Sequence, residues 1–441
     1  MMKLLLSFML PLLALPLFKA SAADWPQWLG PDRASVWQER GIVETFPADG
    51  LNVKWRIPIG LGYSGPAVAD GKVYVLDYEL KSGKIANSPG SRSKLEGQER
   101  VVCFDADSGN VKWTYSYNRE YELSYASGPR CTPTVNDGRV YALGGHGDLT
   151  CLDAESGDVV WKKEHAKEYD APTPIWGFAA HPLVEGNLLY CIVGGEGSVA
   201  VAFDKRTGKE VWRALSANEQ GYCPPTMIEH AGVKQLLIWH PEALNGLNPR
   251  TGEVYWSVDL KPAYGMSVTA PRKVGSYLYA SAIGSIGALV KLDDGKPAAE
   301  IEWRGKSKDS VYCCNSTPHI VDGVIYGNDC QVGSLMAVRL DTAERLWETF
   351  KPTSGGTRRA SHGTAFIVRH QDRFFLFSET GDLILANLSK DGYHEISRFH
   401  VVDPTNECFG RDVVWSHPAF ANKSVYARND KELVCVSLAA E

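Results

Sequence analysis

A short phrase recurs along the chain: an Asp or Asn, a Gly four residues later and a Trp four residues after that. It reads "FDADSGNVKW" at residues 104–113 and returns as "CLDAESGDVVW", "AFDKRTGKEVW" and "GLNPRTGEVYW". Self-similarity of this kind is typical of repeat architectures, so it constrains the fold more than any bulk property does. In each copy the Asp can bond turn amides, the Gly can take a positive φ, and the Trp offers a large packing surface.

Looser copies extend the phrase in both directions and set the number of repeats. The markers are Trp55, Trp113, Trp161, Trp212, Trp256, Trp303, Trp347 and Phe399. They recur about every 49 residues, a period that suits four-stranded propeller blades. Between them, segments such as "SGPAVADGKVYVLD" are typical of two strands joined by an Asp-Gly turn. We therefore predict an all-β fold, an eight-bladed β-propeller of four-stranded antiparallel blades.

The two ends of the chain complement each other. The last repeat, "SHPAFANKSVYARNDKELVCVSL", supplies three strands with no Trp strand after them, while "NVKWRI" near the N-terminus is a Trp strand with no blade before it. Pairing them would close the ring and remove two exposed sheet edges. We expect the propeller to span residues 51–441. Residues 24–50 are expected to form an extension packed on it, with Trp25 and Trp28 as a plug against the ring.

The first 23 residues have the features of a cleaved signal peptide. Lys3 precedes the apolar run "LLLSFMLPLLALPLF", and small residues surround the expected cut after Ala22 or Ala23. The first Cys is Cys103, so none lies near the cut for lipid attachment. We expect periplasmic or extracellular residence. No later stretch is apolar for long enough to span a bilayer, and a net charge of −6 provides no basic surface for nucleic acid.

Ten Cys in an exported chain would ordinarily indicate disulfides. Cys103, Cys151 and Cys435 occupy equivalent strand positions on different blades, too far apart to pair. We interpret them as buried thiols that act as small apolar residues. The adjacent Cys313 and Cys314 are either a vicinal disulfide or two ordinary thiols.

Candidate binding residues cluster where the chain enters each inner strand, because a propeller converges there on its axis. Arg, His and aromatic residues are enriched around these starts. The candidate ligand-binding residues of this axial face are Tyr63, Arg130, Trp176, His181, Tyr222, Asn315, Arg359, His362, Arg411, Trp415 and His417. The long connection of residues 77–100 is predicted to cover the same face.

The repeated phrase resembles the pyrroloquinoline-quinone (PQQ) repeat of eight-bladed propellers in the quinoprotein alcohol dehydrogenase-like superfamily. The opening "DWPQWLGPDR", residues 24–33, resembles the N-terminal signature of secreted members. The resemblance implies the propeller fold for nearly the whole mature chain. It leaves the function open, because the same repeat occurs in quinone-binding dehydrogenases and in the assembly lipoprotein BamB, which binds no quinone.

Three functions, two of them enzymatic, stay open at the level of the sequence. A quinoprotein dehydrogenase would need cations and stacking surfaces for PQQ, together with oxygen ligands for Ca²⁺. The three candidate Arg and two candidate Trp could serve PQQ, and Cys313-Cys314 resembles a disulfide that covers the quinone in such enzymes. However, no Ca²⁺ ligand set stands out, and the Cys pair falls in the sixth blade instead of early in the chain. A polysaccharide-active enzyme, for instance a lyase, would use Arg against a uronate, with Tyr or His as base and acid.

The favoured interpretation is a non-catalytic binding module that uses the axial face. Arg130, Arg359 and Arg411 predict an anionic ligand: a small molecule, a glycan or a protein. No cofactor is predicted outright, so PQQ and Ca²⁺ stay open. We interpret His181, His362 and His417 as wall residues instead of metal ligands, and we expect a monomer.

Overall fold

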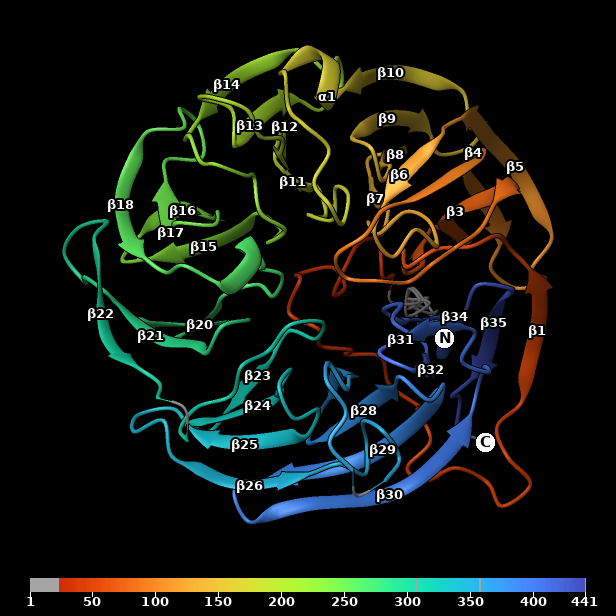
Figure 1. The fold of residues 1–441 in the computed structure, drawn as a ribbon. Helices are drawn as coiled ribbons and strands as arrows, with labels where there is room; N and C mark the ends of the chain where they lie inside the picture. The colour runs from red at the N-terminus through yellow and green to blue at the C-terminus, as the bar shows by residue number, and fades with distance from the viewer. Residues whose placement is uncertain (1–23, 307, 357, 441) are drawn as a thin grey trace, which may run out of the picture.

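The computed structural model describes residues 24–306, 308–356 and 358–440. These residues form eight four-stranded antiparallel sheets arranged radially around a central axis, which confirms the predicted eight-bladed β-propeller (Figure 1). The helical segments among the described residues are the single turns α1 (His165–Glu168) and η1 (Ala263–Gly265). No helix in this part of the chain is long and apolar enough to cross a membrane. The expected signal peptide, residues 1–23, lies outside the described residues.

The first four blades follow one another from the innermost to the outermost strand. Blade 1 consists of β2 (Ala67–Ala69), β3 (Lys72–Gly83), β4 (Ser93–Asp105) and β5 (Val111–Asn118), with β6 (Tyr121–Leu123) paired to β4. Blade 2 consists of β7 (Thr134–Asn136), β8 (Arg139–Leu143), β9 (Asp148–Asp153) and β10 (Val159–Glu164). Blade 3 consists of β11 (Leu183–Glu185), β12 (Leu188–Ile192), β13 (Ala200–Asp204) and β14 (Glu210–Ala214). Blade 4 consists of β15 (Thr226–His230), β16 (Val233–Trp239), β17 (Ala243–Leu247) and β18 (Val254–Asp259).

The remaining blades repeat this order, except that the last takes its outer strand from the N-terminus. Blade 5 consists of β19 (Arg272–Val274), β20 (Tyr277–Ala282), β21 (Ile286–Leu292) and β22 (Ala299–Arg304). Blade 6 consists of β23 (His319–Val321), β24 (Val324–Asn328), β25 (Leu335–Arg339) and β26 (Arg345–Thr349). Blade 7 consists of β27 (Ala365–His370), β28 (Arg373–Ser378), β29 (Asp382–Ser389) and β30 (Gly392–His400). A separate hairpin of β31 (Asn406–Cys408) and β32 (Arg411–Val413) precedes blade 8, which consists of β33 (Ala419–Ala421), β34 (Ser424–Arg428), β35 (Glu432–Ser437) and β1 (Val53–Pro58).

The ring closes by pairing the two ends of the chain, as the sequence predicted. Strand β1 is antiparallel to β35, with Trp55 opposite Cys435 and Pro58 opposite Glu432. Strand β1 (red) therefore lies beside β35 (blue) as the outermost strand of that blade (Figure 1). Closure leaves blade 8 with a full set of four strands and no unpaired edge at the junction.

The repeated phrase forms a packing and hydrogen-bonding contact between neighbouring blades. Oδ1 of Asp153 accepts hydrogen bonds from the turn amides of Glu155 and Ser156, at 3.0 and 3.1 Å. Gly157 has a φ of +78° and lies against the Trp113 indole of the preceding blade, where an added Cβ would come within 2.7 Å of the ring. Nε1 of Trp113 then donates to the Ala154 carbonyl at 3.2 Å. The glycines at 109, 208 and 252 receive the Trp of the preceding blade in the same way.

The small residues opposite these Trp explain the repeated Cys. Cys103, Cys151 and Cys435 each face a Trp of the neighbouring strand across the sheet. All ten cysteines are buried free thiols in the structure. Burial raises the pKa of Cys103 to about 12, which suits the predicted role as a small apolar residue.

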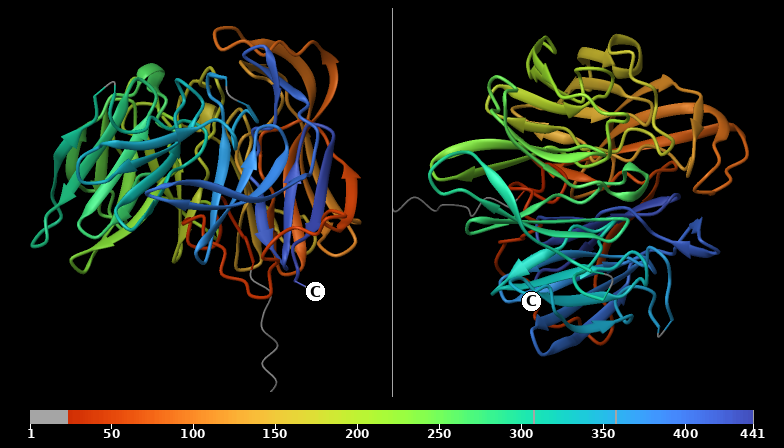
Figure 2. Two further views of the ribbon diagram at one scale, coloured as in Figure 1. Left: turned by 90° about the horizontal axis from the view of Figure 1, so that it is seen from below. Right: turned by 60° about the vertical axis from the view of Figure 1, so that its left-hand side comes forward.

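Residues 24–50 cover the lower face and close the channel there; Figure 2 shows this red segment on the opposite side from the long β3–β4 hairpin. The Trp28 side chain is only 3% exposed and stacks on His181, with ring centroids 4.7 Å apart. It also meets the edge of His417 at 5.8 Å, and Ala270 of a further blade packs against it. Arg33 fastens the segment by donating to the carbonyls of His181 and Pro225. The extension therefore packs against the inner ends of several blades from the lower face.

Candidate functional site

The upper face has a cavity of about 210 Å³ on the propeller axis, directly above the plug. All but two of the candidate residues from the sequence line it, the exceptions being Arg359 and Arg411. The full lining is Tyr63, Pro89, Tyr125, Arg130, Trp176, Ala179, His181, Tyr222, Met266, Val268, Asn315, His362, Phe409, Trp415 and His417.

The propeller architecture brings these side chains together from distant parts of the sequence. Tyr63, Arg130 and His181 immediately precede the inner strands β2, β7 and β11, and Tyr222 and Asn315 precede β15 and β23. Every inner strand starts at the same end of the axis, so its entry loop contributes one or two side chains to one small volume. The site therefore depends on the ring as a whole.

The floor of the cavity is made of neutral imidazoles. The Thr132 amide donates to Nδ1 of His181 at 2.9 Å, so the proton of the neutral ring resides on Nε2. Burial holds the pKa of His181 well below its usual range and lowers that of His417 to about 3. Trp28 covers the same rings from below. The floor thus offers hydrogen-bonding groups without charge.

One cation stands in the wall without a carboxylate partner. Arg130 donates to the carbonyls of Gly128, Ser124 and Tyr125, the last two at 2.8 and 2.7 Å, and its guanidinium lies 5.4 Å from the Tyr63 ring centroid. These bonds fix its position and leave two of its five N–H groups without a partner among the described residues. Because guanidinium does not deprotonate in proteins, the wall keeps a permanent positive charge.

Three tyrosine hydroxyls in the lining are buried and form no well-aligned hydrogen bond among the described residues: those of Tyr63, Tyr125 and Tyr222, although the Asn406 side chain lies near the first and the Trp176 backbone near the last. Burial raises the pKa of each phenol, to about 12 for Tyr125. The hydroxyls therefore stay protonated at neutral pH. Buried polar groups in proteins are almost always bonded, so three orphans in one cavity are unusual.

Aromatic rings form two facing walls. On one side His362 stacks on Phe409 with centroids 4.9 Å apart and planes 6° from parallel, and both lie beside Trp415 at 6.3 Å. On the other side Trp176 lies 5.6 Å from Tyr222. Between the walls a ligand would meet flat apolar surface on two sides and polar groups at the floor.

The structure corrects two of the predicted cations. Nε of Arg411 donates to Oε1 of Glu379 at 2.8 Å and its Nη2 to Oε2 at 3.2 Å, so a buried carboxylate of blade 7 neutralises it outside the cavity. Arg359 is exposed in the connection between β26 and β27. Of the three Arg that the sequence placed on the axial face, Arg130 is the one that lines the cavity among the described residues.

The residues present do not fit a quinone held by Ca²⁺. Among the described residues no Asp or Glu lines the cavity, whereas Ca²⁺ needs several oxygen ligands that include carboxylates. The described residues contain no group of three or more His, Cys, Asp or Glu arranged to hold a metal ion. Cys313 and Cys314 are two free thiols instead of a vicinal disulfide, because their side chains pack into separate apolar clusters.

Sequence reasoning missed the residues that complete the walls. Tyr125 follows β6, and Phe409 is at the tip of the β31–β32 hairpin; both belong to connections that the four-strand repeat does not contain. Met266 and Val268 lie in the connection between blades 4 and 5. Pro89 belongs to the long connection of residues 77–100, which forms extended β3 and β4 and reaches over the axial face as predicted.

These features define the class of the protein as a PQQ-like eight-bladed β-propeller, plugged below and open above to an aromatic cavity. The chain belongs to the family described as "Outer membrane protein assembly factor BamB", whose model matches residues 97–231 and 241–441. No curated protein matches it significantly.

Two solved dehydrogenase structures with low sequence identity share the fold. Quinohemoprotein alcohol dehydrogenase from Comamonas testosteroni aligns with a TM-score of 0.62 at 13% identity, covering 95% of this chain and 81% of that one. A europium-containing methanol dehydrogenase aligns at 0.61 with 12% identity, covering 94% and 89%. BamB from Moraxella catarrhalis aligns at 0.41 with 16% identity, covering 88% and 99%. At these identities the likeness to the dehydrogenases concerns the fold alone.

Proposed function

We propose that the protein is an exported binding protein whose axial cavity holds one sugar ring that carries a single anionic group. The observation that carries the proposal is the set of three orphaned tyrosine hydroxyls inside an aromatic cavity. Orphaned buried hydroxyls are costly unless a ligand completes their hydrogen bonds. A polyhydroxylated ring does so while presenting apolar C–H faces to the facing aromatic walls.

Size and charge narrow the ligand further. A volume of about 210 Å³ is below the roughly 300–1,000 Å³ typical of pockets for drug-sized molecules, so it suits a single ring. Arg130 has no carboxylate to neutralise it, which favours one carboxylate on that ring. The predicted anionic ligand is thereby narrowed to a uronic acid unit.

The ionisation of the lining supports binding over catalysis. Burial lowers the pKa of His362 to about 4 and that of His417 to about 3, so neither ring is a strong base at neutral pH. Burial also raises the pKa of the tyrosines, which keeps them from acting as bases. A general base works best with a pKa near the operating pH, and the cavity provides no carboxylate for that role.

Export to the periplasm or the medium is part of the proposal and rests on the apolar N-terminal segment of the sequence. Mass spectrometry of the protein recovered from its native compartment tests it. The expected mature N-terminus lies at or next to Asp24.

Calorimetry with methyl glucuronide and with methyl glucoside tests the function, because the two ligands differ only in the carboxylate. The uronide should bind and should bind more weakly as salt rises, since salt screens the charge of Arg130. Tyr222→Phe should weaken binding about tenfold by removing one hydrogen bond. Tyr393→Phe, which removes a hydroxyl in a distant network of blade 7, is the matched control and should leave binding unchanged. Equal binding of both glycosides, or binding of neither, would overturn the proposal.

A further inference from the structure

The mouth of the cavity concentrates backbone strain on aromatic residues. Among the described non-glycine residues with φ in the left-handed region, four have ring side chains: Tyr125, Tyr264, His362 and Phe409, with φ from +48° to +60°. All four line the axial cavity or the hollow that continues from it. Bulky residues rarely adopt this conformation, and strained positions cluster at ligand-binding sites.

Two of these rings are also exposed to solvent. Tyr264, in the single turn η1, is 77% exposed, and Phe409 at its hairpin tip is 45% exposed. Burial in the core therefore does not explain why their backbones are held in a costly conformation. The geometry instead presents flat apolar faces outward around the opening.

The opening leads into a groove over blades 3 and 4. The cavity shares Trp176, Met266 and Phe409 with a second hollow of about 810 Å³, which is bounded on its outer side by Tyr264. That hollow in turn shares Glu219 and other residues with a third of about 780 Å³. Because neighbouring hollows share lining residues, the three together continue from the axial cavity over blades 3 and 4.

The charge changes sign along this path. The axial end holds Arg130, whereas the outer hollows contain Glu196, Glu219 and Glu242 against a single Arg92. Arg92 is itself engaged with the carbonyls of Glu122 and Thr173, at 2.8 and 3.2 Å. An anion is therefore favoured at the axis and disfavoured farther out, where carboxylates accept hydrogen bonds from hydroxyl groups.

We propose that the ligand is an oligosaccharide with an acidic terminal unit, which enters the axial cavity while the neutral units that follow lie along the groove on Trp176, Phe409 and Tyr264. This inference rests on the proposed function and adds the chain length and charge pattern of the ligand. A polyuronate fits poorly, because its second and third carboxylates would meet Glu219 and Glu242.

Calorimetry with four probes tests the inference: glucuronic acid, glucuronosyl-xylotriose, xylotetraose and tetragalacturonate. Glucuronosyl-xylotriose should bind at least about tenfold more tightly than glucuronic acid, and tetragalacturonate and xylotetraose should both bind more weakly than the acid-ended tetramer. Tyr264→Ala should abolish the gain from chain length and leave the affinity for glucuronic acid unchanged. Tyr264→Phe keeps the ring and should retain the gain; the exposure of this side chain allows both variants to fold.

The outcomes separate the two proposals. If glucuronic acid binds and the acid-ended tetramer binds no more tightly, or if Tyr264→Ala has no effect, the extended site is wrong and the proposed function stands. If no acidic sugar binds, the proposed function itself fails. An acidic tetrapeptide that binds more tightly than every glycan would overturn the sugar assignment and identify a protein ligand.

Discussion

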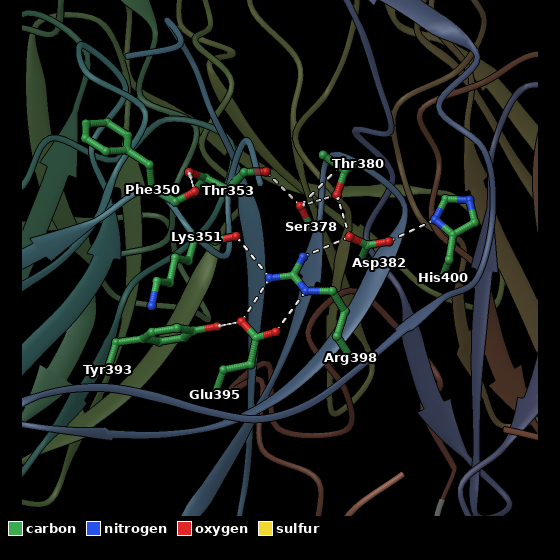
Figure 3. A network of polar contacts seen from close by, with 10 residues as sticks. All are labelled: Phe350, Lys351, Thr353, Ser378, Thr380, Asp382, Tyr393, Glu395, Arg398 and His400. Atoms are coloured by element: carbon green, nitrogen blue, oxygen red, sulfur yellow. Dashed lines mark hydrogen bonds and ion pairs between the residues drawn. The ribbon is translucent and has the colours of Figure 1, made fainter. Parts of the chain in front are cut away.

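Blade 7 contains a second polar cluster, and its contrast with the axial cavity is informative. Arg398 donates to Asp382 at 2.8 Å and to both oxygens of Glu395 at 2.9 Å, while His400 bonds the other oxygen of Asp382 at 2.8 Å (Figure 3). The Tyr393 hydroxyl also donates to Glu395. Each charged group in this cluster faces an opposite charge or a hydrogen-bond partner.

The axial cavity has the opposite character. Its cation, Arg130, is held by carbonyls among the described residues, and the hydroxyls of Tyr63, Tyr125 and Tyr222 form no well-aligned hydrogen bond there. A polar network whose members are all satisfied stabilises the fold, whereas a partly satisfied one costs stability until something completes it. The comparison is consistent with a structural role for the blade 7 cluster and supports the binding site that we propose on the axis.

The largest effect that we expect is a loss of folding stability in acid, caused by the buried histidines of the axial cavity. The pKa of His417 in the folded protein is about 3 and that of His362 about 4, because burial disfavours the charged ring. The unfolded chain, with a pKa near 6.5, binds more protons below that value, so stability should fall as the pH drops from about 6.5 toward 4. The loss reaches up to about 2 kcal/mol for each ring at pH 5.

Urea denaturation at pH 7.5 and pH 5.0 measures this loss. His417→Gln removes one titrating ring. It should reduce the difference in unfolding free energy between pH 7.5 and pH 5.0 by the amount that this ring contributes. A stability that is flat across this range, or a variant with the same slope as the native protein, would contradict the assignment of neutral rings at the floor.

The next largest effect comes from breaking the blade 7 network. Arg398→Met keeps the length of the side chain but leaves Asp382 and Glu395 without their cation, and should cost about 2–3 kcal/mol of unfolding free energy. Ligand binding at the axis should not change. Lys390→Met is the control, since its exposed ammonium forms only a 3.5 Å surface pair with Asp391, worth less than about 1 kcal/mol. A comparable loss in both variants would contradict a structural role specific to the network.

The fold was predictable because its determinants are local. The Asp153 turn, the positive φ at Gly157 and the fastening by Trp113 lie within or next to one repeated phrase, so the sequence alone reveals both the strand order and the period. The contact made by the Trp is less predictable from the sequence where the phrase departs from the pattern. Trp256 faces a longer turn in blade 5, and its Nε1 donates instead to Gln235 of its own blade at 2.7 Å.

The site was predictable only in part. Its inner ring follows from the repeat, because residues before each inner strand converge on the axis. The neutralisation of Arg411 was not predictable, since Glu379 comes from the β28–β29 hairpin of another blade and only the folded ring brings them together. Phe409 was missed for a related reason: its hairpin lies outside the repeat, so no period indicates where its tip points.

A matched pair of hydroxyl deletions sharpens the comparison between satisfied and orphaned groups. Tyr121 is buried and donates to the buried Glu99, so Tyr121→Phe should cost about 1–3 kcal/mol by leaving a carboxylate short of a donor. Tyr222→Phe removes an orphaned hydroxyl and should leave stability unchanged or raise it by about 1 kcal/mol. Urea titrations without ligand measure both values. Equal losses would mean that the Tyr222 hydroxyl is satisfied in solution.

The smallest effect should come from His400 and should have the opposite pH dependence to that of the cavity. Burial opposes the charged ring, but hydrogen bonds to Asp382 at 2.8 Å and Asp403 at 3.0 Å outweigh it and raise the pKa of His400 above 6.5. The stabilisation is then fully present below about pH 6.5 and is lost as the pH rises through the raised pKa of the folded protein. The ring is half exposed, so solvent screening keeps the contribution well below about 1 kcal/mol.

The difference in unfolding free energy between the native protein and His400→Gln isolates the contribution of His400, because acid destabilisation of the cavity is common to both. That difference should be a few tenths of a kcal/mol at pH 5.5 and should shrink by pH 8.5. A difference that grows with pH would show that His400 is neutral in the fold, and blade 7 would then lose one of the charges that set it apart from the axis.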